Sequence, residues 1–197
     1  DWERERFTFD EGLSAAVKDV FIKLHQDGLI YKDKRLSNWD PKLKTTISDL
    51  EVIQKEVKGN LWYIDYNIED SDEIITVATT RPETMLGDTG IAVHPDDERY
   101  QKYIGKNAIL PIVNKKIRIV ADDYAKADQG SGAVKITPAH DFNDFEVGKK
   151  HNLEILNIFD RYAKLNDSVP DKFKGLDRYD ARKKILEDLK NQNLLIK

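Results

Sequence analysis

The chain has no cysteine among its 197 residues. This absence excludes a disulfide framework and a thiolate nucleophile, and it removes the ligand that structural zinc sites use most often. A chain without disulfides is compatible with a reducing compartment, so we expect a cytoplasmic location.

Long apolar runs and a strong excess of one charge are also lacking. No stretch is long enough to span a bilayer, and the first residues, DWERERF, are unlike a signal peptide, so we expect no membrane association. The 36 acidic and 32 basic residues leave a formal net charge of −4 at pH 7. This is not the basic balance of a protein that coats nucleic acid, although a local basic surface could still contact RNA.

Helical periodicity is strongest near the two ends of the chain. In residues 8–28, Thr8 and Glu11 have capping-box spacing, and an apolar stripe follows: Leu13, Val17, Val20, Phe21 and Leu24. Nothing in the first 40 residues offers this helix a packing partner, so we expect it to belong with another domain. Residues 177–194 predict an amphipathic helix whose apolar face holds Ile185, Leu186 and Leu189. Shorter helices are predicted at 95–104 and 141–151, and a connector at 35–45.

From residue 50 onwards the apolar period changes to two, which is typical of strands. In residues 61–68, Trp62, Ile64, Tyr66 and Ile68 alternate with more polar residues. Further short strands rich in Ile and Val are predicted at 74–80, 90–94, 108–113, 116–121 and 132–137. Because their connections are short and varied, we predict an α+β fold with a mixed or antiparallel β-barrel-like core and flanking helices.

The segment ATTRPETMLGDTGIAVHP, residues 78–95, gathers hydroxyl groups and one guanidinium between two apolar strands. Thr79 and Thr80 end the first strand, and Arg81-Pro82 predicts an extended turn because proline disfavours a helical residue before it. Arginine suits a phosphate or another planar, bidentate contact. The segment could equally be a plain connection whose threonine and aspartate side chains satisfy its own backbone.

The segment GSGAVKITPAHDFNDF, residues 130–145, concentrates polar side chains after a short apolar run. Gly130 and Gly132 allow a close backbone approach, and the strand alternation places Lys135 and Thr137 on the face opposite Val134 and Ile136. A lysine and a threonine thus share one face of the strand.

Three interpretations of His140, Asp141 and Asp144 remain open. Asp141 fits a helix N-cap and Asp144 the first turn, so both could be structural. The three side chains also offer nitrogen and oxygen ligands for a metal, although no H-E-x-x-H frame is present. The third interpretation is a small polar pocket in which Lys135 and the two carboxylates hold a zwitterionic ligand.

The two longest motifs carry a family resemblance. TTRPETMLGDTGIAVHPDDERY and GSGAVKITPAHDFNDFEVGKKHNL resemble, nearly residue for residue, the editing (CP1) domain of class I valyl-tRNA synthetases, and the flanking segments resemble those that lead into and out of that domain. The related isoleucyl and leucyl enzymes lack the Arg-Pro-Glu-Thr sequence of 81–84. The HIGH and KMSKS signatures of the synthetic site are absent. The resemblance implies an entry helix and connector at 1–48, a barrel core with a hydrolytic pocket at 49–160, and a helical exit segment at 161–197.

The resemblance implies hydrolysis of the ester that joins threonine to the 3′-terminal adenosine of valine tRNA. An apolar valine pocket cannot strongly reject threonine, an isostere with a hydroxyl, which is a recognised problem for synthetases of small apolar amino acids. A second site must therefore demand that hydroxyl, and buried polar groups do so because valine would leave them unpaired.

Individual roles also follow from the resemblance. Asp144 would bind the substrate α-ammonium, while Thr79 and Thr80 would contact the terminal adenosine or shape the entrance. Other residues would hold the threonine hydroxyl, the ester and the attacking water: Arg81, Lys135, Thr137 and Asp141. Many family members have an aromatic residue where this chain has Gln129, so stacking on the terminal adenine would be lost or supplied by another side chain.

The implied reaction needs no covalent intermediate, no metal and no cofactor in this domain, since ATP is used by the synthetic domain of the parent enzyme. The expected partners are the 3′ acceptor end of tRNA(Val), the threonyl ester and the remainder of the synthetase chain, and we expect a monomer. Two alternatives are a module that binds the acceptor end without chemistry and a metal-dependent hydrolase built on His140, Asp141 and Asp144.

Overall fold

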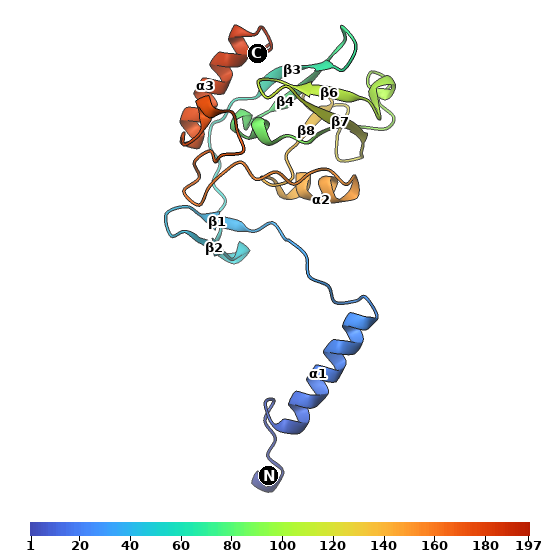
Figure 1. The fold of residues 1–197 in the computed structure, drawn as a ribbon, viewed down its shortest axis with the longest axis vertical. Coiled ribbons are helices and arrows are strands. Elements are labelled where there is room, and N and C mark those ends of the chain that lie inside the picture. Colours follow the sequence, from blue (N-terminus) through green and yellow to red (C-terminus); the bar gives the residue numbers. More distant parts are fainter. The chain divides into compact units, whose positions relative to one another are not determined.

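The computed structural model describes all 197 residues, which divide into two compact units, residues 1–35 and 36–197. In the first unit, a short 3-10 turn (Trp2–Arg4) precedes helix α1 (Glu11–Gln26) (Figure 1). The predicted cap, Thr8, is wrong: the carboxylate of Asp10 accepts the N–H of Leu13 at 2.8 Å. Arg6 also donates to that carboxylate, and a negative charge is favoured at the positive end of a helix.

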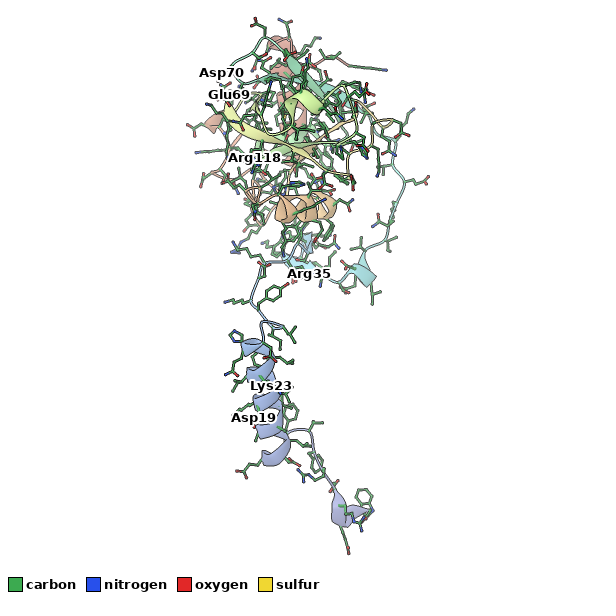
Figure 2. The ribbon with its side chains drawn as sticks, turned by 90° about the vertical axis from the view of Figure 1, so that its right-hand side faces the viewer. Asp19, Lys23, Arg35, Glu69, Asp70 and Arg118 are labelled. Atoms are coloured by element: carbon green, nitrogen blue, oxygen red, sulfur yellow. The ribbon has the colours of Figure 1, made fainter.

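Helix α1 has no buried residue. Its side chains, Asp19 and Lys23 among them, radiate around the helix (Figure 2). The predicted apolar stripe stays largely exposed, with Val17 65% and Phe21 55% accessible to solvent. Within residues 1–35 this helix therefore has no core to pack on, as its sequence predicted.

The second unit is built around one six-stranded sheet. Its strands are β3 (Trp62–Ile68), β4 (Ile74–Thr79), β5 (Gly90–Val93), β6 (Asn107–Leu110), β7 (Lys115–Ala121) and β8 (Ala133–Ile136). They lie in the order β4-β3-β6-β7-β5-β8, and every pair is antiparallel except β5 with β7. The two outer strands, β4 and β8, also contact each other, so the sheet nearly closes. The predicted mixed, barrel-like core with flanking helices is confirmed (Figure 1).

Two apolar clusters hold this unit together. The larger one contains Ile64 and Tyr66 of β3, both fully buried, together with Ile185 and Leu189 of helix α3 (Arg178–Asn191). The smaller one lies between the sheet and helix α2 (Phe142–Lys150) and contains Ala92, Val120, Ile136 and Val147. Each fully buried large aliphatic side chain contributes about 1.5–3 kcal/mol, so both helices are bound chiefly by apolar burial. Leu186, predicted for the apolar face of α3, is only partly buried.

Three predicted elements are corrected. The connector at 35–45 contains a hairpin strand, β1 (Asn38–Asp40), which pairs with β2 (Thr45–Ile47) through a turn in which Lys44 has φ +59°. Residues 95–104 form turns and a 3-10 helix (Gln101–Tyr103) instead of an α-helix. The carboxylate of Asp97 there accepts the backbone N–H of Arg99 at 3.1 Å, which favours a turn. The strand at 108–113 ends at Leu110, before Pro111, which has no N–H to donate.

The unit also contains four short 3-10 segments: Asp49–Glu51, Pro82–Gly87 (η3), Gln101–Tyr103 and Asp171–Phe173. Of these, η3 borders the cavity described below. Beyond α3 the chain returns to β3, where the N–H of Ile196 donates to the carbonyl of Tyr63 at 2.9 Å. Helix α3, which precedes this last segment, contacts η3. None of the helices combines the length and apolar character that crossing a membrane requires.

Candidate functional site

A cavity of about 220 Å³ opens beside the ends of β4 and β8, η3 and the start of α2. It is smaller than the ~300–1,000 Å³ pockets that take drug-sized ligands, and it suits an amino acid. Every predicted site residue except Gln129 lines it: Thr79, Thr80, Arg81, Lys135, Thr137, Asp141 and Asp144. The remaining lining residues were not predicted as site residues: Leu61, Ala78, Thr84, Tyr124, Val134 and His140.

Strand β8 and the residue that follows it supply two of these side chains, but Val134, which the alternation predicted on the opposite face, also lines the cavity. Lys135 and Thr137 line the cavity, whereas Ile136 packs in the smaller core with Val147 of α2. The strand ends before Pro138, which lies against Gly148 of α2. A Cβ at Gly148 would stand 2.7 Å from Pro138 Cγ, so glycine lets the helix approach the strand end closely.

A buried hydrogen-bond network forms the floor of the cavity. The Lys135 ammonium donates to Thr84 Oγ1 at 2.9 Å, to Asp88 Oδ1 at 3.0 Å and to Thr137 Oγ1. The Thr137 hydroxyl donates to Asp88 Oδ1 at 2.6 Å, and the Tyr66 hydroxyl donates to Asp88 Oδ2 at 2.8 Å. Asp88 is fully buried and Lys135 is 6% exposed, so the two charges neutralise each other away from bulk water.

The surroundings of Asp88 set its protonation and that of its neighbour. Burial raises the pKa of the Asp88 carboxyl above its ordinary value, while the charge of Lys135 opposes that rise and favours the carboxylate. Burial, followed by the charge of Asp88, raises the pKa of Tyr66 well above its ordinary value. Tyr66 therefore remains a neutral hydrogen-bond donor to the carboxylate at all ordinary pH values.

Sequence reasoning missed Asp88 and Thr84 as site residues, although both lie in the motif that it singled out. Asp88 stands two residues before β5, and β5 pairs with β8, which carries Lys135. A carboxylate next to a buried strand requires a cation or hydrogen-bond donors as partners. This requirement is the feature of the sequence that could have indicated Asp88 as a site residue. The pairing of the two strands, which identifies Lys135 as that partner, is not visible in the sequence.

The two carboxylates at the start of α2 have different environments. Asp141 caps the helix, since its Oδ1 accepts the N–H groups of Asn143 at 2.9 Å and Asp144 at 3.2 Å. Asp144 Oδ2 accepts the backbone N–H of Thr137 at 2.8 Å. Burial raises the pKa of Asp144 to about 6, against the opposing charge of Lys135. Asp144 is thus an anion above about pH 6 and could hold a ligand cation in the cavity.

Arg81 stands at the rim and is held from two sides. Its Nη1 donates to the carbonyl of His140 at 2.7 Å, and its Nε lies 3.7 Å from Glu83 Oε1. The Glu83 carboxylate is buried and receives two hydrogen bonds from Arg182 of α3, at 2.8 and 2.9 Å. The Arg81 side chain remains 47% exposed, so its other N–H groups can reach a ligand at the cavity mouth.

His140 has a structural environment. Its Nε2 accepts the backbone N–H of Ile158 at 3.0 Å, and its ring meets that of Phe159 edge to face at 4.9 Å between centroids. Burial, followed by the charge of Arg81, lowers the pKa of His140 to about 3, so the ring is neutral. Its ring nitrogen is already committed to the backbone, and no group of three His, Cys, Asp or Glu side chains is arranged to hold a metal.

Tyr124 lies in the cavity wall, whereas Gln129 lies outside it. Tyr124 lines the cavity, and burial, followed by the charges of Asp144 and Asp141, raises its pKa to about 12. No pattern in the sequence signalled this tyrosine. Gln129 is exposed in the turn before β8, where its carbonyl accepts the N–H of Gly132 at 2.8 Å. Its predicted place near a bound adenosine stays a prediction.

Comparisons with known proteins agree on one family. The family model described as "tRNA synthetases class I (I, L, M and V)" matches residues 1–188. A valine--tRNA ligase of Francisella tularensis subsp. tularensis is 59% identical over the whole chain, and one of Pelagibacter ubique is 57% identical over the whole chain. The chain spans only 21% and 22% of these two relatives.

Two solved structures show the same fold at low sequence identity. One is a LeuRS of Agrobacterium radiobacter in a ternary complex with tRNA and LeuAMS, with a TM-score of 0.55 and 18% identity over 94% of this chain and 32% of that one. The other is GlLeuRS-CP1, with a TM-score of 0.54 and 13% identity over 70% of this chain and 98% of that one.

Proposed function

Because this chain belongs to the class I tRNA synthetases and aligns along its whole length with valine--tRNA ligases, we propose that it is the editing part of such a ligase. Its reaction is the hydrolysis of the aminoacyl ester of threonyl-tRNA(Val). The partners in this proposal are the 3′ acceptor end of the tRNA and the remainder of the ligase chain, in the cytoplasm where the tRNA is charged. The reaction requires water and no cofactor in this part, because ATP serves amino acid activation in the rest of the ligase.

The observation that carries the proposal is the Asp144 carboxylate in a cavity of amino acid size. A pKa of about 6 makes this buried group an anion at neutral pH, and an aminoacyl ester carries an α-ammonium that needs such a partner. Lys135 and Thr137 lie on the same cavity wall and form the polar floor. This floor can pair with the hydroxyl of threonine, whereas a methyl group of valine would leave polar atoms without partners.

The proposed chemistry relies on positioning. Water attacks the ester carbonyl carbon, the bond from that carbon to the ribose oxygen of the terminal adenosine breaks, and the ribose hydroxyl leaves with a proton. Holding the ammonium at Asp144 and the ester near Arg81 would present the carbonyl to water in one orientation. Asp141, Thr79 and Thr80 line the same cavity and complete the proposed contacts to the ester and the adenosine.

Deacylation of matched tRNA substrates tests the proposal. Threonyl-tRNA(Val) and valyl-tRNA(Val) are incubated with the 197-residue chain and, in parallel, with a full-length ligase that contains it. We expect threonyl-tRNA to be hydrolysed at least ~100-fold faster than valyl-tRNA, since a site built to pair with a hydroxyl rejects its absence strongly. Equal rates on the two esters would contradict the proposed specificity.

Two control measurements separate the alternatives. Binding of the tRNA acceptor end without turnover, by both the chain and the full-length ligase, would identify a binding module. Loss of activity after dialysis against a chelator, with recovery on adding metal, would identify a metal-dependent hydrolase.

A further inference from the structure

We infer that Asp88 sets the hydrogen-bond polarity of the cavity floor, so that the side chain of the bound amino acid must donate a hydrogen bond to the floor. This inference deepens the proposed function and rests on it for the identity of the ligand. It makes Asp88 a positioning residue that determines specificity, since it acts through Lys135 and Thr137.

The ammonium group of Lys135 uses all its hydrogen-bond donors within the protein. An ammonium has three N–H groups and no lone pair. These groups are directed to Thr84 Oγ1, Asp88 Oδ1 and Thr137 Oγ1. All three donors are therefore committed within the protein, and the only cation on the floor has none left for a ligand.

Of the hydroxyl groups that line the cavity, those of Thr84 and Thr137 contact Lys135. Each hydroxyl has one proton and two lone pairs. Thr84 directs its proton to the carbonyl of Arg81 at 3.0 Å, and Thr137 directs its proton to Asp88 Oδ1 at 2.6 Å. Each oxygen also accepts one N–H of Lys135. One acceptor position remains on each threonine, and neither has a proton left.

Asp144, which also lines the cavity, is an acceptor as well when it is ionised. The floor consequently offers acceptors to a ligand. The other donors that line the cavity belong to residues outside this hydrogen-bond network: Thr79, Thr80, Tyr124 and the partly exposed Arg81. A ligand hydroxyl satisfies this floor by donating its proton. A substituent of similar size that has no proton to donate, such as fluorine, would face the lone pairs of the floor oxygens and form no hydrogen bond with them.

Asp88 is the cause of this polarity. A carboxylate can only accept, and the two oxygens of Asp88 take protons from Lys135, Thr137 and Tyr66. Because Asp88 has no exposed surface, bulk water does not compete with it for these protons. Without the carboxylate, the Thr137 proton and one Lys135 N–H would be free to turn toward the cavity.

Binding of non-hydrolysable ligands to the wild-type chain is the direct test. The probes are 2′-amino-2′-deoxyadenosine and 3′-amino-3′-deoxyadenosine, each acylated through an amide with threonine, with 2-amino-3-fluorobutanoic acid or with valine, and calorimetry gives the dissociation constants. We expect the threonine analogue to bind at least about 10-fold more tightly than the fluoro analogue, which should resemble the valine analogue. A fluoro analogue that binds as well as threonine, or no binding preference at all, overturns the inference.

This measurement is independent of turnover. A chain that prefers the threonine analogue but does not hydrolyse threonyl-tRNA would contradict the proposed function and support the polarity. A chain that hydrolyses threonyl-tRNA but binds the fluoro analogue as tightly as the threonine analogue would support the proposed function and contradict the polarity.

Two variants test the role of Asp88 itself. In Asp88→Asn the amide oxygen can still accept from Lys135 and Thr137 while the amide nitrogen donates to Tyr66, whose hydroxyl reverses to accept. This variant should keep the preference for threonine over the fluoro analogue. Asp88→Ala should reduce the preference to within about 3-fold, because the freed donors can meet fluorine. A retained preference in Asp88→Ala, or a lost one in Asp88→Asn, overturns the assignment. If Asp88→Ala does not fold, as circular dichroism would show, the wild-type ligand series and Asp88→Asn decide.

Discussion

At the scale of single residues, the charge of Asp144 can be separated from its structural contact. Its Oδ2 accepts the N–H of Thr137, and the amide oxygen of asparagine can do the same. Asp144→Asn should therefore preserve the fold but remove the anion that we assign to the substrate ammonium. We expect deacylation of threonyl-tRNA(Val) to fall at least ~100-fold, the order that the loss of a buried charged contact implies.

The matched control is the same substitution at Asp167, whose side chain is fully exposed. Asp167→Asn should leave the deacylation rate unchanged. A rate for Asp144→Asn close to that of the wild type would remove Asp144 from the proposed site.

The raised pKa of Asp144 predicts opposite pH effects on activity and stability. Activity should rise as the pH increases through about 6, because only the carboxylate holds an ammonium. For stability, the folded pKa lies above the ordinary value of 3.8, so the folded state binds more protons between these two values. The contribution of this group to the free energy of unfolding therefore decreases as the pH rises from about 4 to about 6.

Paired urea titrations of the wild type and Asp144→Asn measure this stability effect. The stability difference between the two proteins should change within that window and level off above about pH 7. A difference that stays constant from pH 4 to 7 would show that Asp144 titrates normally.

At the scale of elements, the capping role of Asp141 in α2 can be separated from its proposed role in the cavity. Its Oδ1 caps α2. Serine can supply the same cap, whereas alanine cannot and should cost about 1 kcal/mol of stability. If Asp141 also contacts the ester or the water, Asp141→Ser should retain the stability but lose at least about 10-fold in the deacylation rate. Wild-type activity in Asp141→Ser would leave Asp141 with the cap alone.

The Glu83–Arg182 pair joins η3 to α3 and supports the rim residue Arg81. The Glu83 side chain is 4% exposed and that of Arg182 is 27% exposed. Removing one partner of a buried pair leaves a charge uncompensated, which typically costs ~3–5 kcal/mol. The partial exposure of Arg182 and the remaining contact of Glu83 with Arg81 place this pair near the lower end. Arg182→Met should thus lower the free energy of unfolding by about 2–3 kcal/mol in urea titration.

Two comparisons sharpen this prediction. The double variant with Glu83→Gln should lose less than the sum of the single losses, since neither charge is then left alone. Lys183→Ala, which removes an exposed pair with Asp180, should change stability by less than about 0.5 kcal/mol. Additive losses in the double variant would show that the pair is not coupled.

At the scale of the whole molecule, the two units should differ in their contribution to stability. No residue of α1 is buried, and residues 1–35 form a unit of their own. Deleting residues 1–35 should therefore shift the melting temperature of the remaining chain by less than about 2 °C, which corresponds to well under 1 kcal/mol at this size. Deleting residues 178–197 should instead unfold the chain, because it removes the fully buried Ala181, Ile185 and Leu189. A large loss of stability on the first deletion would contradict the division.

Much of the architecture could be predicted from local pattern. The alternation in β3 and β8 identified both strands and the shared face of Lys135 and Thr137, because a strand side chain points to one of two faces. The cap at Asp141 could be predicted because its hydrogen bonds go to backbone N–H groups two and three residues further along the chain. The helix at 95–104 was wrong for the same kind of reason: a contact between Asp97 and Arg99 overrode the weak helical pattern.

The sequence alone therefore determined which segments are strands or helices, which faces are apolar, and, through two long motifs, the family. Only the tertiary structure decided that Asp88 accepts from Lys135, Thr137 and Tyr66, and that Arg182 pairs with Glu83. These partners lie 22 to 99 positions apart along the chain. Periodicity reports the direction of a side chain relative to its own element, whereas hydrogen-bond partners between elements depend on strand pairing, register and packing. For that reason most polar residues of the cavity could be predicted from the sequence, but Thr84, Tyr124 and the buried carboxylate of Asp88 could not.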